Sequence, residues 1–284
     1  MYKLLRDKNF ESEMKLNTKI LQNTKTLQET MLEATNAASK ITLPLFRSSL
    51  VIENKLKQGF DPVTKADRDA EKIIREIIAR KFSDHSIFGE ELDDKITNSS
   101  YAWVIDPIDG TRAFISGLPT WGTLIGLLDG ETAIAGLMSQ PFTGEIFIAT
   151  GKKAEYIYQR KTTPLISSNT KNLSEAIMFT TTPALFAKPA QRAAYDEIEN
   201  KVRLARYGID CYAYALLAMG QIDLIIEPDL KQCDIAPLIA IIENSGAVVC
   251  TWNKKSAHNG GNIIAAATLE LLDEALEILH KHLA

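Results

Sequence analysis

The stretch Asp106-Pro107-Ile108-Asp109-Gly110-Thr111 combines residue types that suit phosphate chemistry. The apolar residues 102–105 before it predict a buried strand, so Asp106 is expected where that strand ends. Pro107 cannot extend a sheet ladder and Gly110 adopts backbone angles closed to other residues, so the chain should turn and direct two carboxylates toward one point. Gly110 and Thr111 would offer backbone N–H groups at a helix start, where anions bind. Carboxylates beside such amides indicate metal-assisted phosphate chemistry, although either dipeptide alone is also an ordinary turn signal.

Three further acidic segments each allow a purely structural interpretation. Thr64 and Asp67 fit a capping box at the start of a helix whose apolar residues follow at helical spacing. The pair Glu90-Glu91 follows a short apolar run, and two adjacent glutamates usually lie at a solvated surface. Asp234 opens an apolar helical stretch, where an acid commonly caps the helix.

Together and in this order, the four segments resemble the motif set of the inositol monophosphatase-like superfamily of Mg²⁺-dependent sugar-phosphate phosphatases. The resemblance runs from about Leu27 to the C-terminus. Finer features are similar to the histidinol-phosphate phosphatase branch, namely residues 62–67, 109–117 and 210–215. Two positions depart from the family pattern: Cys233 replaces an aromatic residue before the last aspartate, and Ala113 stands where serine is common.

The resemblance implies a metal centre of two or three Mg²⁺ ions. Glu90, Asp106 and the backbone carbonyl of Ile108 would hold the first ion, and Asp106 would bridge to a second ion completed by Asp109 and Asp234. Mg²⁺ prefers hard oxygen ligands and keeps several waters, so carboxylates suffice without histidine. Two carboxylates about 4 Å apart repel by about 4 kcal/mol at an effective dielectric of 20, so such a cluster calls for cations.

The same resemblance assigns the catalytic roles. Asp67 would act through ordered water and pair with Thr111 to orient the attacking hydroxide, with Glu90 at the metal beside them. The residues expected to contact phosphate or substrate are Gly110, Thr111, Arg112, Asp210 and Glu227.

Glu227 and Lys57 each also allow a purely structural interpretation. Glu227 could pair with a substrate hydroxyl or with an ammonium group, or be an exposed acid at a strand end. Lys57 resembles a basic residue that lies near the metals in relatives, but a lone lysine is usually solvated.

Composition excludes several other classes. With 284 residues, 45% of them hydrophobic, the chain can form about two domains or one large one. Its net charge of −4 argues against nucleic acid, and no apolar run approaches the ~20 residues of a membrane-spanning helix. The cysteines and histidines lack the spacing of disulfide frameworks or zinc sites. No secretory signal or typical transit peptide is recognisable, so a cytoplasmic location is predicted.

The element pattern predicts a mixed α+β and α/β fold. Residues 1–22 are expected to be a charged extension, 23–155 an α+β half with an antiparallel sheet and a helix from about Thr26, and 156–284 an α/β half. Asp129-Gly130 is a hairpin signal between two apolar strands. The resemblance implies a layered α-β-α-β-α sandwich and a homodimer.

The predicted function is a Mg²⁺-dependent phosphomonoesterase whose preferred substrate is L-histidinol phosphate, which places it in histidine synthesis. The alternative within the enzyme class is an inositol-1-monophosphatase of broad specificity. Nucleotide 3′-phosphates and fructose bisphosphate are less expected, because no segment is of the kind that would hold a second phosphate. The alternative from outside the enzyme class is an inactive relative that binds a ligand or partner without turnover.

Overall fold

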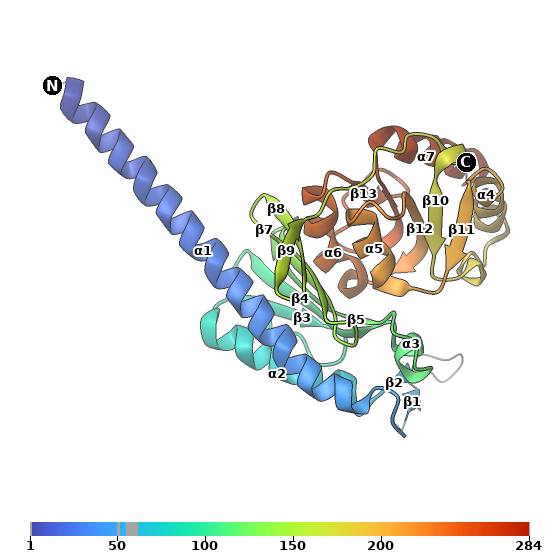
Figure 1. Cartoon of the computed structure of the whole chain (residues 1–284), viewed down its shortest axis with the longest axis horizontal. Coiled ribbons are helices and arrows are strands. Elements are labelled where there is room, and N and C mark those ends of the chain that lie inside the picture. The colour runs from blue at the N-terminus through green and yellow to red at the C-terminus, as the bar shows by residue number, and fades with distance from the viewer. Residues whose placement is uncertain (1, 50–51, 55–61, 284) are drawn as a thin grey trace.

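The structure is a computed structural model that describes residues 2–49, 52–54 and 62–283, with side chains in 24–49, 52–54 and 64–283. Lys57 therefore lies outside the described residues. Two helices, α1 (Tyr2–Leu45) and α2 (Lys65–Lys81), pack on one face of a seven-stranded sheet (Figure 1). The short strands β1 (Glu53–Asn54) and β2 (Pro62–Val63) pair with each other.

The first sheet follows chain order from β3 to β9. Its first two strands are parallel and all later neighbours are antiparallel, so the expectation of a wholly antiparallel sheet was wrong at this edge. The strands are β3 (Ser86–Gly89), β4 (Tyr101–Asp109), β5 (Gly122–Asp129), β6 (Thr132–Gln140), β7 (Glu145–Thr150), β8 (Lys153–Tyr158) and β9 (Lys161–Pro164).

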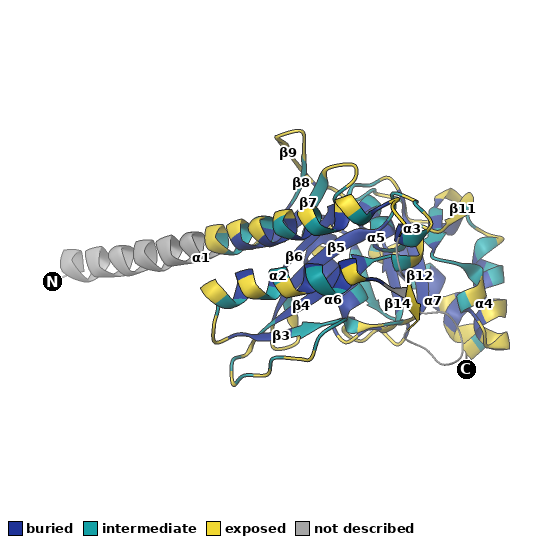
Figure 2. Ribbon diagram, turned by 90° about the horizontal axis from the view of Figure 1, so that it is seen from below, coloured by how far each residue is buried: buried dark blue, intermediate teal, exposed yellow. Residues whose placement is uncertain are grey.

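The second sheet is mixed, in the order β11-β10-β12-β14-β13. Helices α5 (Asp210–Ala218) and α6 (Gln232–Asn244) lie between the two sheets, and α4 (Pro189–Glu199) and α7 (Leu269–Leu283) pack together beyond the second one (Figures 1 and 2). The predicted α-β-α-β-α sandwich is therefore confirmed. The strands are β10 (Ile177–Thr180), β11 (Leu204–Tyr207), β12 (Leu224–Leu230), β13 (Val248–Thr251) and β14 (Gly261–Ala266); short helical elements are α3 (Thr111–Ile115), η1 (Leu173–Glu175) and η2 (Pro183–Leu185).

Two strand glycines let α6 press against the first sheet. A Cβ added at Gly126 of β5 would lie 2.7 Å from Pro237 Cα, and one at Gly136 of β6 would lie 2.0 Å from Pro237 O. Neither approach tolerates a side chain. This contact fixes the height of α6 above the sheet and thereby positions Asp234 in its first turn.

Three local expectations differ from the structure. Helix α1 begins at Tyr2 rather than near Thr26, since good helix formers without glycine or proline fill the segment before it. Strand β4 continues through Asp109 instead of ending at Asp106, with a register shift between these two residues. Strands β8 and β9 extend the first sheet, so the predicted boundary after residue 155 falls inside β8.

In the described part of the chain, no helix is long and apolar enough to cross a membrane.

Candidate active site

A cleft of about 370 Å³ is lined by residues from the ends of both sheets and from α5 and α6. It brings together ten side chains or backbone groups that the sequence pointed to: Glu90, Asp106, Ile108, Asp109, Gly110, Thr111, Arg112, Asp210, Glu227 and Asp234. Their assembly from segments 144 residues apart in the chain cannot come from any one local turn or helix cap.

The loop after β4 is shaped by hydrogen bonds among its own residues. Asp106 Oδ1 accepts the backbone N–H of Ile108 at 3.0 Å, and the carbonyl of Ile108 accepts the hydroxyl of Thr111 at 3.1 Å. Gly110 has φ +80°, a left-handed conformation that favours glycine, and caps the short helix α3. The irregular register lets β4 carry both aspartates to the cleft, although the strand does not stop at the first.

Asp106 is the common member of two groups of potential metal ligands. The first contains Glu90, Asp106 and Cys233, and the second contains Asp106, Asp109 and Asp234, with ligand atoms within 4.8 Å of one another in each group. Burial raises the pKa of Asp106 well above its usual value, and the charges of Glu90, Asp109 and Asp234 raise it further. Because these donors are mostly hard oxygens that repel one another, the set fits Mg²⁺.

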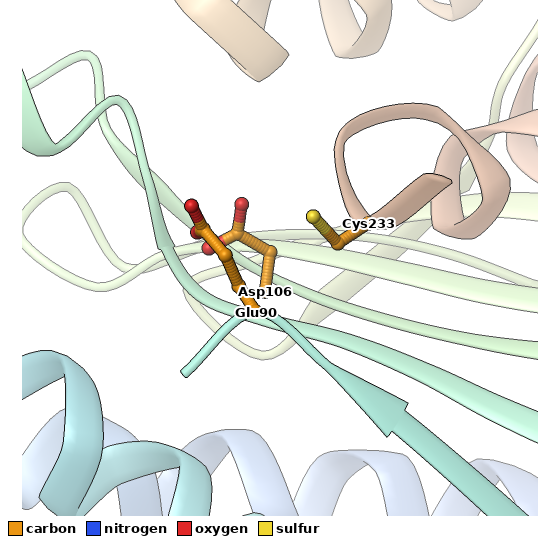
Figure 3. A group of neighbouring side chains, drawn as sticks. All are labelled: Glu90, Asp106 and Cys233. Atoms are coloured by element: carbon orange, nitrogen blue, oxygen red, sulfur yellow. The ribbon is translucent and has the colours of Figure 1, made fainter. Parts of the chain in front are cut away.

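Cys233 lies at the edge of this cluster. Its Sγ points toward the carboxylates of Glu90 and Asp106, as Figure 3 shows, and lies 3.4 Å from Asp234 Oδ1. The side chain is 8% exposed, and burial followed by the nearby carboxylates raises the thiol pKa. A thiol is a soft ligand whereas Mg²⁺ prefers hard oxygen ligands, so the carboxylates of the cluster suit Mg²⁺ better than Cys233 does.

A buried ion pair on α2 holds the loop that carries Glu90, and sequence reasoning missed it. The Glu71 carboxylate, 0% exposed, accepts the N–H of Glu91 at 2.8 Å, and Arg75 donates to Glu71 at 2.7 Å and to the carbonyl of Leu92 at 3.0 Å. A Cβ at Gly89 would lie only 2.0 Å from Glu71 Oε1. The sequence offered one signal for this ion pair, because Glu71 falls on the same helical face as the apolar residues of α2.

The second half of the chain meets the β4 loop through α5 and α6. Asp109 Oδ2 accepts the backbone N–H of Cys211 at 2.7 Å, and Asp234 Oδ2 accepts that of Lys231 at 2.7 Å. Burial raises the pKa of Asp234, and the backbone bond from Lys231 opposes this rise. Backbone amides from the second half of the chain therefore hold both carboxylates in position.

Glu227 is buried, so it is not the exposed acid that the structural alternative described. It is 3% exposed, and its carboxylate accepts the N–H of Thr181 at 2.8 Å and the hydroxyl of Tyr214 at 2.9 Å. Burial raises the pKa of Glu227.

Asp210 begins α5 with its backbone in the left-handed region, at φ 39°. Burial raises the pKa of Asp210 to about 6, and the positive charge of Arg112 opposes this rise.

Asp67 is held by its own helix cap and is not among the residues that line the cleft. Its Oδ2 accepts the backbone N–H of Thr64 at 2.9 Å and the Thr64 hydroxyl at 2.6 Å, which confirms the capping box. Burial raises its pKa and the charge of Glu90 adds to that rise, so the two carboxylates interact electrostatically. The water-mediated role of Asp67 stays a prediction.

Comparisons with known proteins agree with this architecture. Residues 23–284 match the model of the inositol monophosphatase family, and the chain belongs to that family. It is 36% identical over 258 residues to the bifunctional phosphatase IMPL2, chloroplastic, of Arabidopsis thaliana, covering 87% of this chain and 73% of the relative. A histidinol-phosphatase of Chlorobaculum parvum is 32% identical over 237 residues, covering 83% of this chain and 90% of the relative. Among solved structures, an inositol monophosphatase from Zymomonas mobilis superposes with a TM-score of 0.78 at 32% identity, covering 89% of this chain and 96% of that one.

The chain is therefore a phosphatase of this family, which acts on small phosphate monoesters and is generally Mg²⁺-dependent.

Proposed function

We propose that this phosphatase hydrolyses L-histidinol phosphate to L-histidinol and phosphate with two or three Mg²⁺ ions, as a step of histidine synthesis. The observation that carries the proposal is one cleft that combines a carboxylate cluster able to hold a metal ion with two further acids, Asp210 and Glu227. A phosphate ester that also bears an ammonium group would match both features. Its negative phosphate would bind the metal held by the cluster, and its positive ammonium group would pair with the two further acids.

The metal centre would be held by Glu90, Asp106, Asp109, Asp234 and the carbonyl of Ile108. When bound, Mg²⁺ supplies positive charge to the phosphoryl group and makes water a stronger nucleophile. The Thr111 hydroxyl, bonded to the carbonyl of Ile108, would orient the attacking water together with Asp67. Gly110, Thr111 and Arg112 line the cleft where they would position the phosphate oxygens.

Asp210 supports the preference for an amino-alcohol phosphate. With its pKa raised to about 6 it is largely ionised at neutral pH and can pair with an ammonium group. Relatives named histidinol-phosphatase also support the proposal.

Inositol-1-monophosphatase of broad specificity is the second candidate. Glu227 is a buried acceptor that could take a polyol hydroxyl, and the Zymomonas mobilis inositol monophosphatase is as similar as the bacterial histidinol-phosphatase. An inactive relative would need a defect in the cleft, whereas all the residues expected to bind metal are among those that line it.

Phosphate release from histidinol phosphate and inositol 1-phosphate, measured in parallel with Mg²⁺ and with chelator, tests the proposal. We expect a clear preference for histidinol phosphate in kcat/KM, and Asp210→Asn should reduce it more for this substrate than for inositol 1-phosphate. Equal or reversed preference would support the inositol phosphatase, and binding of ester without release would support the inactive relative. A homodimer and a cytoplasmic location stay predictions.

A further inference from the structure

Lys231 places a positive charge against the carboxylate cluster. Its Nζ lies 2.8 Å from Glu90 Oε1, which joins the residue before α6 to the loop after β3. The Lys231 side chain is 54% exposed, whereas the Glu90 side chain is only 13% exposed. Lys231 also lines the cleft together with Thr111 and Arg112, where the phosphate of a substrate would lie.

An ammonium on Glu90 Oε1 disfavours a divalent ion at the same oxygen. Two cations that share one carboxylate oxygen repel each other, so the ion binds better once the ammonium has moved away. Lysine suits such an exchange, because its charge is compact, strongly hydrated and carried on a flexible stem. The main-chain N–H of Lys231 donates to Asp234 Oδ2 at 2.7 Å, and this bond does not depend on where the Lys231 side chain lies.

We propose that Lys231 competes with the first Mg²⁺ for Glu90 and, once displaced, gives its charge to the phosphate group of the substrate. The inference rests on the proposed function, since it assumes that Glu90 binds metal. Its consequence is that Lys231 weakens binding of the metal alone and strengthens binding of phosphate to the metal-loaded protein.

Titration calorimetry with Mg²⁺ alone tests the competition without any reference to activity. Lys231→Met should bind Mg²⁺ about two- to fivefold more tightly than the wild type, the change expected from losing one partly exposed ion pair. Lys254→Met is the matched control. Lys254 is 55% exposed and pairs with Asp273 at 2.6 Å but does not line this cleft, so its variant should bind Mg²⁺ like the wild type.

Lys231→Arg keeps the charge and should also bind Mg²⁺ like the wild type. In saturating Mg²⁺, inorganic phosphate should bind more weakly to Lys231→Met than to either control. Unchanged or weaker Mg²⁺ binding by Lys231→Met would overturn the competition, and unchanged phosphate binding would overturn the second role. A wild type that binds no Mg²⁺ would instead overturn the proposed function itself.

Discussion

Replacing Asp106 with asparagine should stabilise the metal-free protein while abolishing its activity. Asp106 is 1% exposed and belongs to both ligand groups, whose ligand atoms lie within 4.8 Å of one another. At that separation and an effective dielectric of 20, two ionised carboxylates repel by about 3.5 kcal/mol. Protonation relieves part of this repulsion, because burial raises the pKa of Asp106. We therefore expect the free energy of unfolding to rise by about 1–3 kcal/mol.

Urea unfolding in chelator and in Mg²⁺ measures the effect. Ligand binding at a free concentration of 100 Kd adds about 2.7 kcal/mol to the stability of the wild type. The variant should gain less than about 1 kcal/mol from the same Mg²⁺ concentration, because the bridging charge is missing. The stability advantage of Asp106→Asn over the wild type should therefore shrink or reverse when Mg²⁺ is added.

Asp223→Asn is the control for a buried aspartate outside the cluster. Its carboxylate is 5% exposed and accepts the N–H of Ile177 at 2.8 Å, so the substitution should destabilise the protein with and without Mg²⁺. An Asp106→Asn protein that is less stable than the wild type in chelator would refute the reasoning from charge repulsion.

Three further predictions follow from named contacts. Glu71→Gln should weaken Mg²⁺ binding about tenfold in calorimetry, because the loop that carries Glu90 loses its anchor; equal affinities would make the anchor dispensable. Thr111→Ala should lower kcat more than KM in phosphate-release assays, and a pure KM effect would make Thr111 a substrate-binding residue. Burial raises the pKa of Asp210 from 3.8 to about 6. Between these two values the folded protein keeps a proton on Asp210 that the unfolded chain has released. The contribution of Asp210 to stability therefore falls as pH rises through this interval. Asp210→Asn should therefore gain stability relative to the wild type between about pH 4 and about pH 7 in urea unfolding, whereas a pH-independent difference would contradict the shift.

Features encoded within a few residues were predictable from the sequence. The capping box of Thr64 and Asp67 and the hairpin at Asp129-Gly130 depend on neighbours in the chain, and both are confirmed. The resemblance to the family predicted the layered fold, which is confirmed, and the set of metal ligands, which stays a prediction although these residues line one cleft. Local chemistry alone left Asp67, Glu90 and Asp234 with structural alternatives.

Features that depend on distant partners were missed. Glu71 holds the Glu90 loop across 20 residues, and the burial of Glu227 depends on Thr181 and Tyr214 from other elements. Pro107 was expected to end β4, but a register shift accommodates it, because an irregular ladder does not need its N–H. Edge strand β9 is exposed and polar, so no apolar pattern marked it.

Phosphate release from histidinol phosphate during a Mg²⁺ titration, from excess chelator to excess metal, tests the central claim most directly. The wild type should release phosphate only as Mg²⁺ becomes available, and Asp106→Asn should stay at least about a hundredfold slower at every concentration. Release by the wild type in chelator, or near-normal release by Asp106→Asn, would contradict a metal centre built on Asp106.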